Sequence, residues 1–145
     1  MEELIPLFNQ ITNIEIQDLD NHEETYPVIQ QLFETLKAGI RGFRETATSK
    51  FLHMTYPNLL VMADSIIASY MQNRNIIQHH FTKGDDYINL LRFYCSEINE
   101  LIEDIMENHH LNRLDAVNRL REMDEYAIGS IPRIIDKHFY WIETH

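Results

Sequence analysis

Apolar residues recur at helical intervals along most of this 145-residue chain. The most regular stripe has spacings of 4, 3, 4, 3 and 4 and consists of Tyr87, Leu91, Tyr94, Ile98, Leu101 and Ile105. Such spacing places the six side chains on one face of an α-helix and predicts near-parallel packing against a neighbour, as in a bundle. The acidic residues of the same segment fall mostly on the other face, and they are Glu97, Glu100, Glu103, Asp104 and Glu107.

Two other stripes predict long helices. The first follows Thr25 and consists of Ile29, Phe33, Leu36, Ile40 and Phe43. We expect its helix to continue through Gly39 and Gly42, which either let a neighbour approach closely or mark a bend. The second follows Thr55 and consists of Leu59, Met62, Ala63, Ile66, Tyr70 and Ile77, widened by Leu60, Ile67 and Met71. We predict that this second segment is the central, most buried helix, because its apolar residues cover so much of the circumference.

Helix starts are marked by capping residues. Three sites place a hydroxyl residue, an apolar residue and a proline in succession: Thr25-Tyr26-Pro27, Thr55-Tyr56-Pro57 and Ser130-Ile131-Pro132. A hydroxyl at the N-cap accepts a hydrogen bond from a free amide, and proline in the first turn loses no helical hydrogen bond. Asp85, after the break at Lys83-Gly84, and Asn112 are predicted to cap two further helices.

The remaining segments complete an all-α chain. Leu4, Leu7, Phe8 and Ile11 predict a short first helix, and the acidic, less periodic residues 13–22 are interpreted as a loop. The helix from Asn112 is expected to carry Leu114, Val117, Leu120 and Met123 toward Ile128 and to end at Gly129-Ser130, before a last helix from Pro132 through Trp141. The prediction is a compact bundle of five to six helices that forms a single helical domain over residues 1–145.

Composition narrows the protein class. Apolar residues make up 44% of the chain and charged residues 24%, which is typical of a globular protein. Gly and Pro number only four each, too few for the turns of an all-β sandwich. Cys95 is the single cysteine, so an intramolecular disulfide is excluded, and we expect a buried thiol. The start Met1-Glu2-Glu3 is unlike a signal peptide, and the richest apolar stretch, Leu59 to Met71, is interrupted by Asp64. We therefore expect a cytoplasmic protein with no membrane association.

The negative charge is concentrated near the N-terminus. Residues 1–36 contain eight acidic residues and no Lys or Arg, which accounts for −8 of the formal net charge of −11. Such a field repels phosphates and anionic lipid and attracts basic protein surfaces. The leading hypothesis is a non-catalytic, acidic regulatory or inhibitory protein, of the immunity-protein, antitoxin or inhibitor type, that binds a protein partner with a basic surface. The predicted binding residues are Glu15, Asp18, Asp20, Glu23 and Glu24, and direct nucleic-acid binding is disfavoured.

Catalytic motifs give no support for an enzyme. The chain has no Gly-rich phosphate loop, no Gly-x-Ser-x-Gly elbow and no His-Glu-x-x-His. Its best metal-ligand set is Glu103, Glu107 and His110, but Glu107-x-x-His110 lacks the second Glu-x-x-His that a di-iron carboxylate site needs. We therefore predict no metal and no cofactor.

One short motif offers an enzymatic alternative. Arg133-x4-His138, followed by Phe139 and Tyr140, resembles the Arg-x4-His-x-Tyr signature of HEPN-domain ribonucleases, which are all-α domains of about this size. The resemblance covers Arg133 to Trp141 and implies that Arg133, His138 and Tyr140 act on RNA, usually across a dimer interface. The preferred interpretation is that Arg133 and His138 are surface residues beside a core-facing Ile134 and Ile135.

Two further hypotheses concern ligands and assembly. The segment from Ser65 to about Ile142 resembles the regulatory domain of TetR-type repressors, which implies a small-molecule-binding module with an apolar pocket lined by Tyr70, Tyr87 and Tyr94. The chain also carries more apolar residues than five modest helices are expected to cover, along the Tyr87–Ile105 stripe, in the predicted helix after Thr55 and at Phe139-Tyr140-Trp141. This excess predicts a homodimer.

Overall fold

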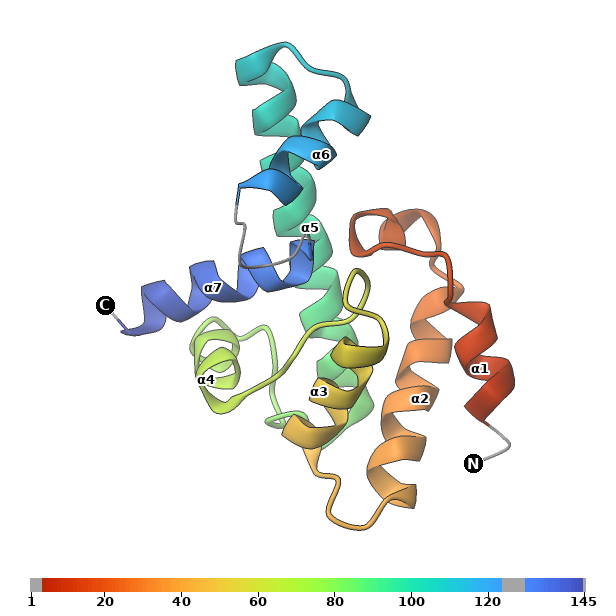
Figure 1. Ribbon diagram of the computed structural model, residues 1–145. Helices are drawn as coiled ribbons and strands as arrows, with labels where there is room; N and C mark the ends of the chain where they lie inside the picture. Colours follow the sequence, from red (N-terminus) through yellow and green to blue (C-terminus); the bar gives the residue numbers. More distant parts are fainter. Residues whose placement is uncertain (1–3, 124–129, 145) are drawn as a thin grey trace.

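The computed structural model describes the backbone of residues 4–123 and 130–144, and the side chains of those residues up to position 138. Over this part of the chain the fold is all-α with no strand, as predicted (Figure 1). Eight helical segments occur there, more than the predicted five to six. They are α1 (Leu4–Gln10), the 3-10 helix η1 (Ile16–Asn21), α2 (Thr25–Gly39), α3 (Glu45–Thr55), α4 (Ser65–Asn73), α5 (Gly84–His109), α6 (Arg113–Glu122) and α7 (Ile131–Thr144).

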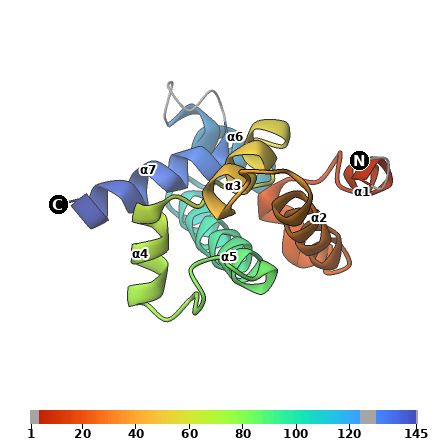
Figure 2. The same cartoon turned by 90° about the horizontal axis from the view of Figure 1, so that it is seen from below.

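The long helix α5 is the centre of the fold. Figure 2 shows α2 on one side of it and α4 and α7 on the other, and α6 packs along its C-terminal half in Figure 1. The predicted stripe is the buried face of this helix, since Tyr87, Leu91, Tyr94 and Ile98 are all inaccessible to solvent. Leu90 and Ile102 are also buried, so the apolar surface of α5 is wider than one stripe. The prediction that the segment after Thr55 forms the central helix is therefore wrong.

The Thr55-Tyr56-Pro57 signature ends a helix instead of starting one. The Thr55 hydroxyl donates to the Phe51 carbonyl and the Tyr56 amide to the Leu52 carbonyl, both within the last turn of α3. Proline is common just after a helix as well as in its first turn, so the same residues fit both ends. The next segment crosses the core without helical structure and buries the side chains of Leu59, Leu60, Val61 and Ala63.

Helix α4 begins later than expected, at an acidic cap. The Asp64 carboxylate accepts from the amides of Ile66 at 3.0 Å and Ile67 at 2.9 Å. An Asp in this position is a strong N-cap, because it pairs two amides that have no partner within the helix. Asp64, which interrupts the apolar stretch in the sequence, is thus the N-cap of α4.

The helix after Thr25 is interrupted where the two glycines lie. Helix α2 ends at Gly39, and Gly42 has a φ of +86°, a left-handed conformation that favours glycine. The chain then turns and begins α3 at Glu45, a helix the stripe did not separate from the preceding one. The N-cap of α2 is Glu24, without a side-chain capping bond, and Thr25 is its first residue.

Two predicted caps had opposite outcomes. Asn112 caps α6 as expected, since its side chain accepts from the Asp115 amide at 2.8 Å. Asp85 does not cap α5, because the helix begins at Gly84 with Lys83 in the N-cap position. Its neighbour Asp86 is buried and points back into the preceding loop, where it accepts from the amides of Gln78, His79 and Phe81.

The predictions for the last two helices are confirmed in part. Val117 and Leu120 of α6 are buried as predicted, but Leu114 and Met123 are 69% and 64% exposed. Ala116 takes the place of Leu114 in the core, so the buried face is rotated relative to the predicted stripe. Ile128 and Gly129 lie outside the described residues. Helix α7 occupies the predicted position, and the Ser130 hydroxyl before it donates to the Pro57 carbonyl at 2.6 Å.

Candidate functional site

The acidic segment predicted as a loop contains an ordered 3-10 turn. Ile16 and Leu19 lie three residues apart and are fully buried, which matches the three-residue repeat of a 3-10 helix. Gln17 is also buried, and the Ile16 amide donates to the Asn58 carbonyl at 3.0 Å. The short turn η1 packs directly on α5, so the most acidic part of the chain is anchored by its own apolar residues.

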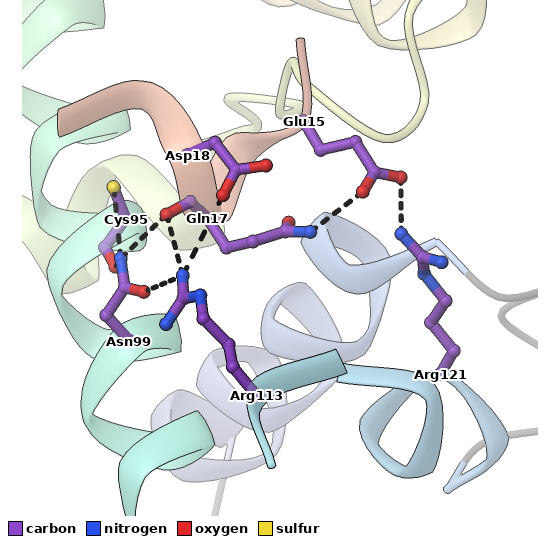
Figure 3. A network of polar contacts seen from close by, with 7 residues as sticks. All are labelled: Glu15, Gln17, Asp18, Cys95, Asn99, Arg113 and Arg121. Carbon is purple, nitrogen blue, oxygen red and sulfur yellow. Dashed lines mark hydrogen bonds and ion pairs between the residues drawn. The ribbon is translucent and has the colours of Figure 1, made fainter. Parts of the chain in front are cut away.

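A polar network joins this turn to α5 and α6, as Figure 3 shows. The Gln17 backbone carbonyl accepts from Asn99 Nδ2 at 3.0 Å and from Arg113 Nη2 at 3.3 Å. Arg113 also donates to Asn99 Oδ1 at 2.7 Å and lies 3.8 Å from the Asp18 carboxylate. A carbonyl at the start of the chain is thus held by two side chains that lie more than eighty residues later.

Two other acids of the predicted binding set are paired with arginines. Glu15 forms an ion pair with Arg121 of α6 and accepts from Gln17 Nε2 at 2.8 Å (Figure 3). Glu23 forms a bidentate pair with Arg92 of α5, with both N–O distances at 2.9 Å. The hydrogen bond from Arg92 lowers the pKa of Glu23, because it favours the ionised carboxylate.

The remaining two predicted residues also have local partners. Asp20 accepts from the Tyr26 hydroxyl at 3.1 Å, and Glu24 lies 3.4 Å from Nδ1 of His22. The structure thus brings Glu15, Asp18 and Glu23 to arginines of α5 and α6. The negative field near the N-terminus is therefore partly neutralised within the molecule.

A second acidic surface lies on the C-terminal half of α5. It comprises Glu97, Glu100, Glu103, Asp104 and Glu107, and we call it the α5 acidic face. Within the part of the chain described, none of these five carboxylates forms an ion pair. The sequence shows these acids as the solvent face of an amphipathic helix, which is the ordinary role of such residues.

What the sequence does not show is the groove beside this face. A groove of about 370 Å³ lies between α5, α6 and α7. Its apolar lining comes from all three helices and comprises Leu101, Leu120, Met123, Ile134 and Ile135. Glu97, Glu100 and Asp104 line it from α5, and His138 lines it from α7. The α5 acidic face and an apolar groove thus adjoin along two turns of one helix.

The residues of the ribonuclease-like motif point in different directions. Arg133 and His138 are five residues apart, so their side chains differ by about 140° around an α-helix. Arg133 lies 3.5 Å from the Asp136 carboxylate, and its charge adds to burial in lowering the pKa of His53, whereas His138 lines the groove beside α5. Ile135 is buried, as the preferred, non-enzymatic interpretation expects, and Ile134 is half-buried. The Tyr140 side chain lies outside the described part.

A buried carboxyl of α7 is the most perturbed acid in this region. Asp136 is 3% exposed, and its Oδ1 accepts from the Tyr94 hydroxyl at 2.5 Å. Burial raises the pKa of Asp136 to about 7, although the Tyr94 hydrogen bond and Arg133 both favour the ionised form. Nothing in the local sequence distinguishes this acid from an exposed one. Its partner on α5 lies 42 residues earlier, so only the fold brings the two together.

The other candidate features contribute to packing. Tyr70, Tyr87 and Tyr94 are buried, and the Tyr87 hydroxyl donates to the Val61 carbonyl at 2.9 Å. These tyrosines do not line the groove beside α5. They also do not line the groove between residues 12–15 and 55–59 or the one beside Asp18 and Arg113. Five of the six residues of the Tyr87–Ile105 stripe are buried within one chain, so most of this stripe does not need a second copy to cover it; Leu101 is half-buried and lines the groove beside α5. The Phe139-Tyr140-Trp141 side chains lie outside the described part.

The described residues also bear on the predictions about metals, the cysteine and membranes. No group of three or more His, Cys, Asp or Glu side chains in the described ranges is arranged to hold a metal ion. Glu103, Glu107 and His110 are each exposed to solvent. Cys95 is buried and free, as predicted, and burial raises its pKa to about 11. Among the helices described, none combines the length and apolarity needed to cross a bilayer.

Comparisons with known proteins give no relationship: no protein-family model, no curated protein and no solved structure matches this chain.

Proposed function

We propose that this chain is a non-catalytic regulatory or inhibitory protein that binds a protein partner with a basic surface. The α5 acidic face is the surface that meets this partner. The observation that supports the proposal is the contrast between the two acidic regions. Glu15, Asp18 and Glu23 are paired with arginines of the same chain, whereas the five carboxylates of the α5 acidic face have no such partner among the described residues.

The contrast matters because a free carboxylate is better placed to attract a cation than a paired one. An acid already paired with arginine must exchange that partner before it can contact another cation. Five carboxylates within three helical turns produce a concentrated field that accelerates association with a cationic surface. The acids of residues 15–24 have a different role in this proposal, since they hold the N-terminal segment on α5 and α6.

Capture of a partner from the native host tests this proposal. Immobilised wild-type protein, the Glu103→Lys/Glu107→Lys variant and the Glu24→Lys control are compared, and retained proteins are identified by mass spectrometry. All three changed residues are exposed, so the fold is expected to tolerate the substitutions. We expect a basic protein that binds the wild type and Glu24→Lys but not the α5 variant.

The captured protein is then purified and titrated by calorimetry at two salt concentrations. Weaker binding at high salt is expected for an interaction between charged surfaces. A partner that is lost with Glu24→Lys and retained by the α5 variant would return the binding surface to residues 15–24. If the capture experiment recovered no protein partner at low salt or at physiological salt, the proposal as a whole would be contradicted.

A further inference from the structure

The groove beside the α5 acidic face has the composition of a helix-binding site. Its floor is apolar, with Leu101, Ile134 and Ile135 contributed by α5 and α7. Met123 stands at the end of α6 with 64% of its surface exposed, although it lines the groove. Methionine adapts its shape to different partners and is frequent at binding surfaces. An exposed Met beside the half-buried Ile134 and the buried Ile135 is therefore suited to cover an incoming apolar side chain.

The length of the groove indicates what kind of segment fits. Along α5 it extends from Glu97 to Asp104, a rise of about 10 Å or two helical turns. Two turns of a partner helix present apolar residues at positions i, i+4 and i+7 on one face. Such a face can place successive side chains between α5 and α7 while the rest of the helix stays in solvent.

The charges beside the groove select among occupants. Glu97, Glu100 and Asp104 place three carboxylates along this side, and a partner with Lys or Arg flanking its apolar face complements them. Nucleic acid and anionic lipid are repelled by the same residues. A second copy of this chain is disfavoured as well, because it carries a formal net charge of −11.

We propose that this groove binds an amphipathic, Lys- and Arg-rich helix of a partner protein, with two or more apolar side chains seated between α5, α6 and α7. The inference rests on the proposed function and adds the class of partner segment to it. The α5 acidic face sets the charge of the partner, and the apolar floor sets its pattern of hydrophobic residues. The two contributions can be separated by experiment, because they come from different side chains.

The test uses three synthetic peptides of about 14 residues, long enough to form a helix when bound. The first has Leu at i, i+4, i+7 and i+11 with Lys elsewhere, the second replaces every Leu with Ser, and the third replaces every Lys with Glu. Binding to the whole protein is measured by calorimetry. We expect the Leu/Lys peptide to bind more tightly than the Ser/Lys peptide and the Leu/Glu peptide to show no binding.

A matched pair of variants locates the site. Met123→Gln removes an apolar side chain from the groove, whereas Leu114→Gln removes a similarly exposed one near the other end of α6 that does not line it. We expect Met123→Gln to weaken Leu/Lys binding about tenfold, the effect of losing one buried apolar contact, and Leu114→Gln to have no effect. Thermal unfolding followed by circular dichroism checks that both variants remain folded.

Each other result has a distinct meaning. Equal binding of the Leu/Lys and Ser/Lys peptides, unchanged by Met123→Gln, would overturn the groove inference and leave the proposed function standing. If neither the Leu/Lys nor the Ser/Lys peptide bound, the inference would be overturned, and the proposed function would then depend on the capture experiment alone. A doubled mass in light scattering that Met123→Gln returns to the monomer would show that a second copy occupies the groove, which also overturns the inference.

Discussion

Replacing Asp136 with Asn should change how the stability of this protein depends on pH. The carboxyl is 3% exposed and lies against the Tyr94 hydroxyl and the Arg133 guanidinium. Its pKa is about 7 in the folded protein against an ordinary value of 3.8. Because the folded state holds the Asp136 proton more tightly than the unfolded state does, protonation of Asp136 makes its full contribution to the free energy of unfolding below about pH 4. That contribution is lost progressively as the pH rises to about 7.

The magnitude follows from the size of the pKa shift. A difference of about 3 pH units corresponds to about 4 kcal/mol of unfolding free energy between the two ends of this range. Asn has nearly the same shape, keeps a carbonyl oxygen for the Tyr94 hydroxyl and carries no charge. Asp136→Asn should therefore be clearly more stable than wild type at pH 8, and this advantage should shrink or disappear toward pH 4.

Urea unfolding followed by circular dichroism at several pH values between 4 and 8 measures this difference. Subtracting the variant from the wild type cancels the titration of the other acids and histidines. Asp115→Asn, which alters an exposed carboxylate, is the control and should give a small difference. If the difference between wild type and Asp136→Asn were constant across this pH range, the raised pKa of the buried Asp136 carboxyl would be refuted.

Three further predictions follow from other contacts. Asp86→Ala should lower the free energy of unfolding by about 2–4 kcal/mol in urea melts, because three loop amides lose a buried charged acceptor, whereas Asp85→Ala should have a much smaller effect. Cys95 should react with Ellman's reagent only after denaturant is added, since the thiol is buried and its pKa is raised; rapid reaction in the native protein would argue against this packing. Purified protein should not cleave single-stranded or structured RNA, because Arg133 is engaged by Asp136, and cleavage that is lost in His138→Ala would favour the ribonuclease interpretation.

The sequence predicts the elements whose signals are local. The stripe from Tyr87 to Ile105 lies within one helix and is buried except at Leu101, and Asn112 caps its own helix by accepting from an amide three residues later. The signature at Thr55 failed because a hydroxyl followed by proline occurs at both ends of helices, and only the chain beyond it decides between them. The 3-10 helix within residues 13–22 is not predicted, because its only buried apolar residues, Ile16 and Leu19, are three residues apart and lie among charged residues, which gives no α-helical stripe.

The candidate site depended on contacts that no local pattern contains. Glu15 and Arg121 are 106 residues apart, and Gln17 meets Arg113 over 96 residues, so the sequence shows the acids but not their partners. The α5 acidic face could be predicted as a polar helix face. The groove beside it could not, because it exists only where α6 and α7 pack against α5 and leave Met123 uncovered.

Residue-resolved NMR provides the most direct test of the α5 surface as the binding site. Labelled protein is titrated with the Leu/Lys peptide, and amide shift changes are mapped along the chain. The account predicts the largest changes in residues 97–107 of α5, at the end of α6 and near residues 134–138 of α7. Changes concentrated in residues 15–24 instead, or no saturable change anywhere, would contradict it.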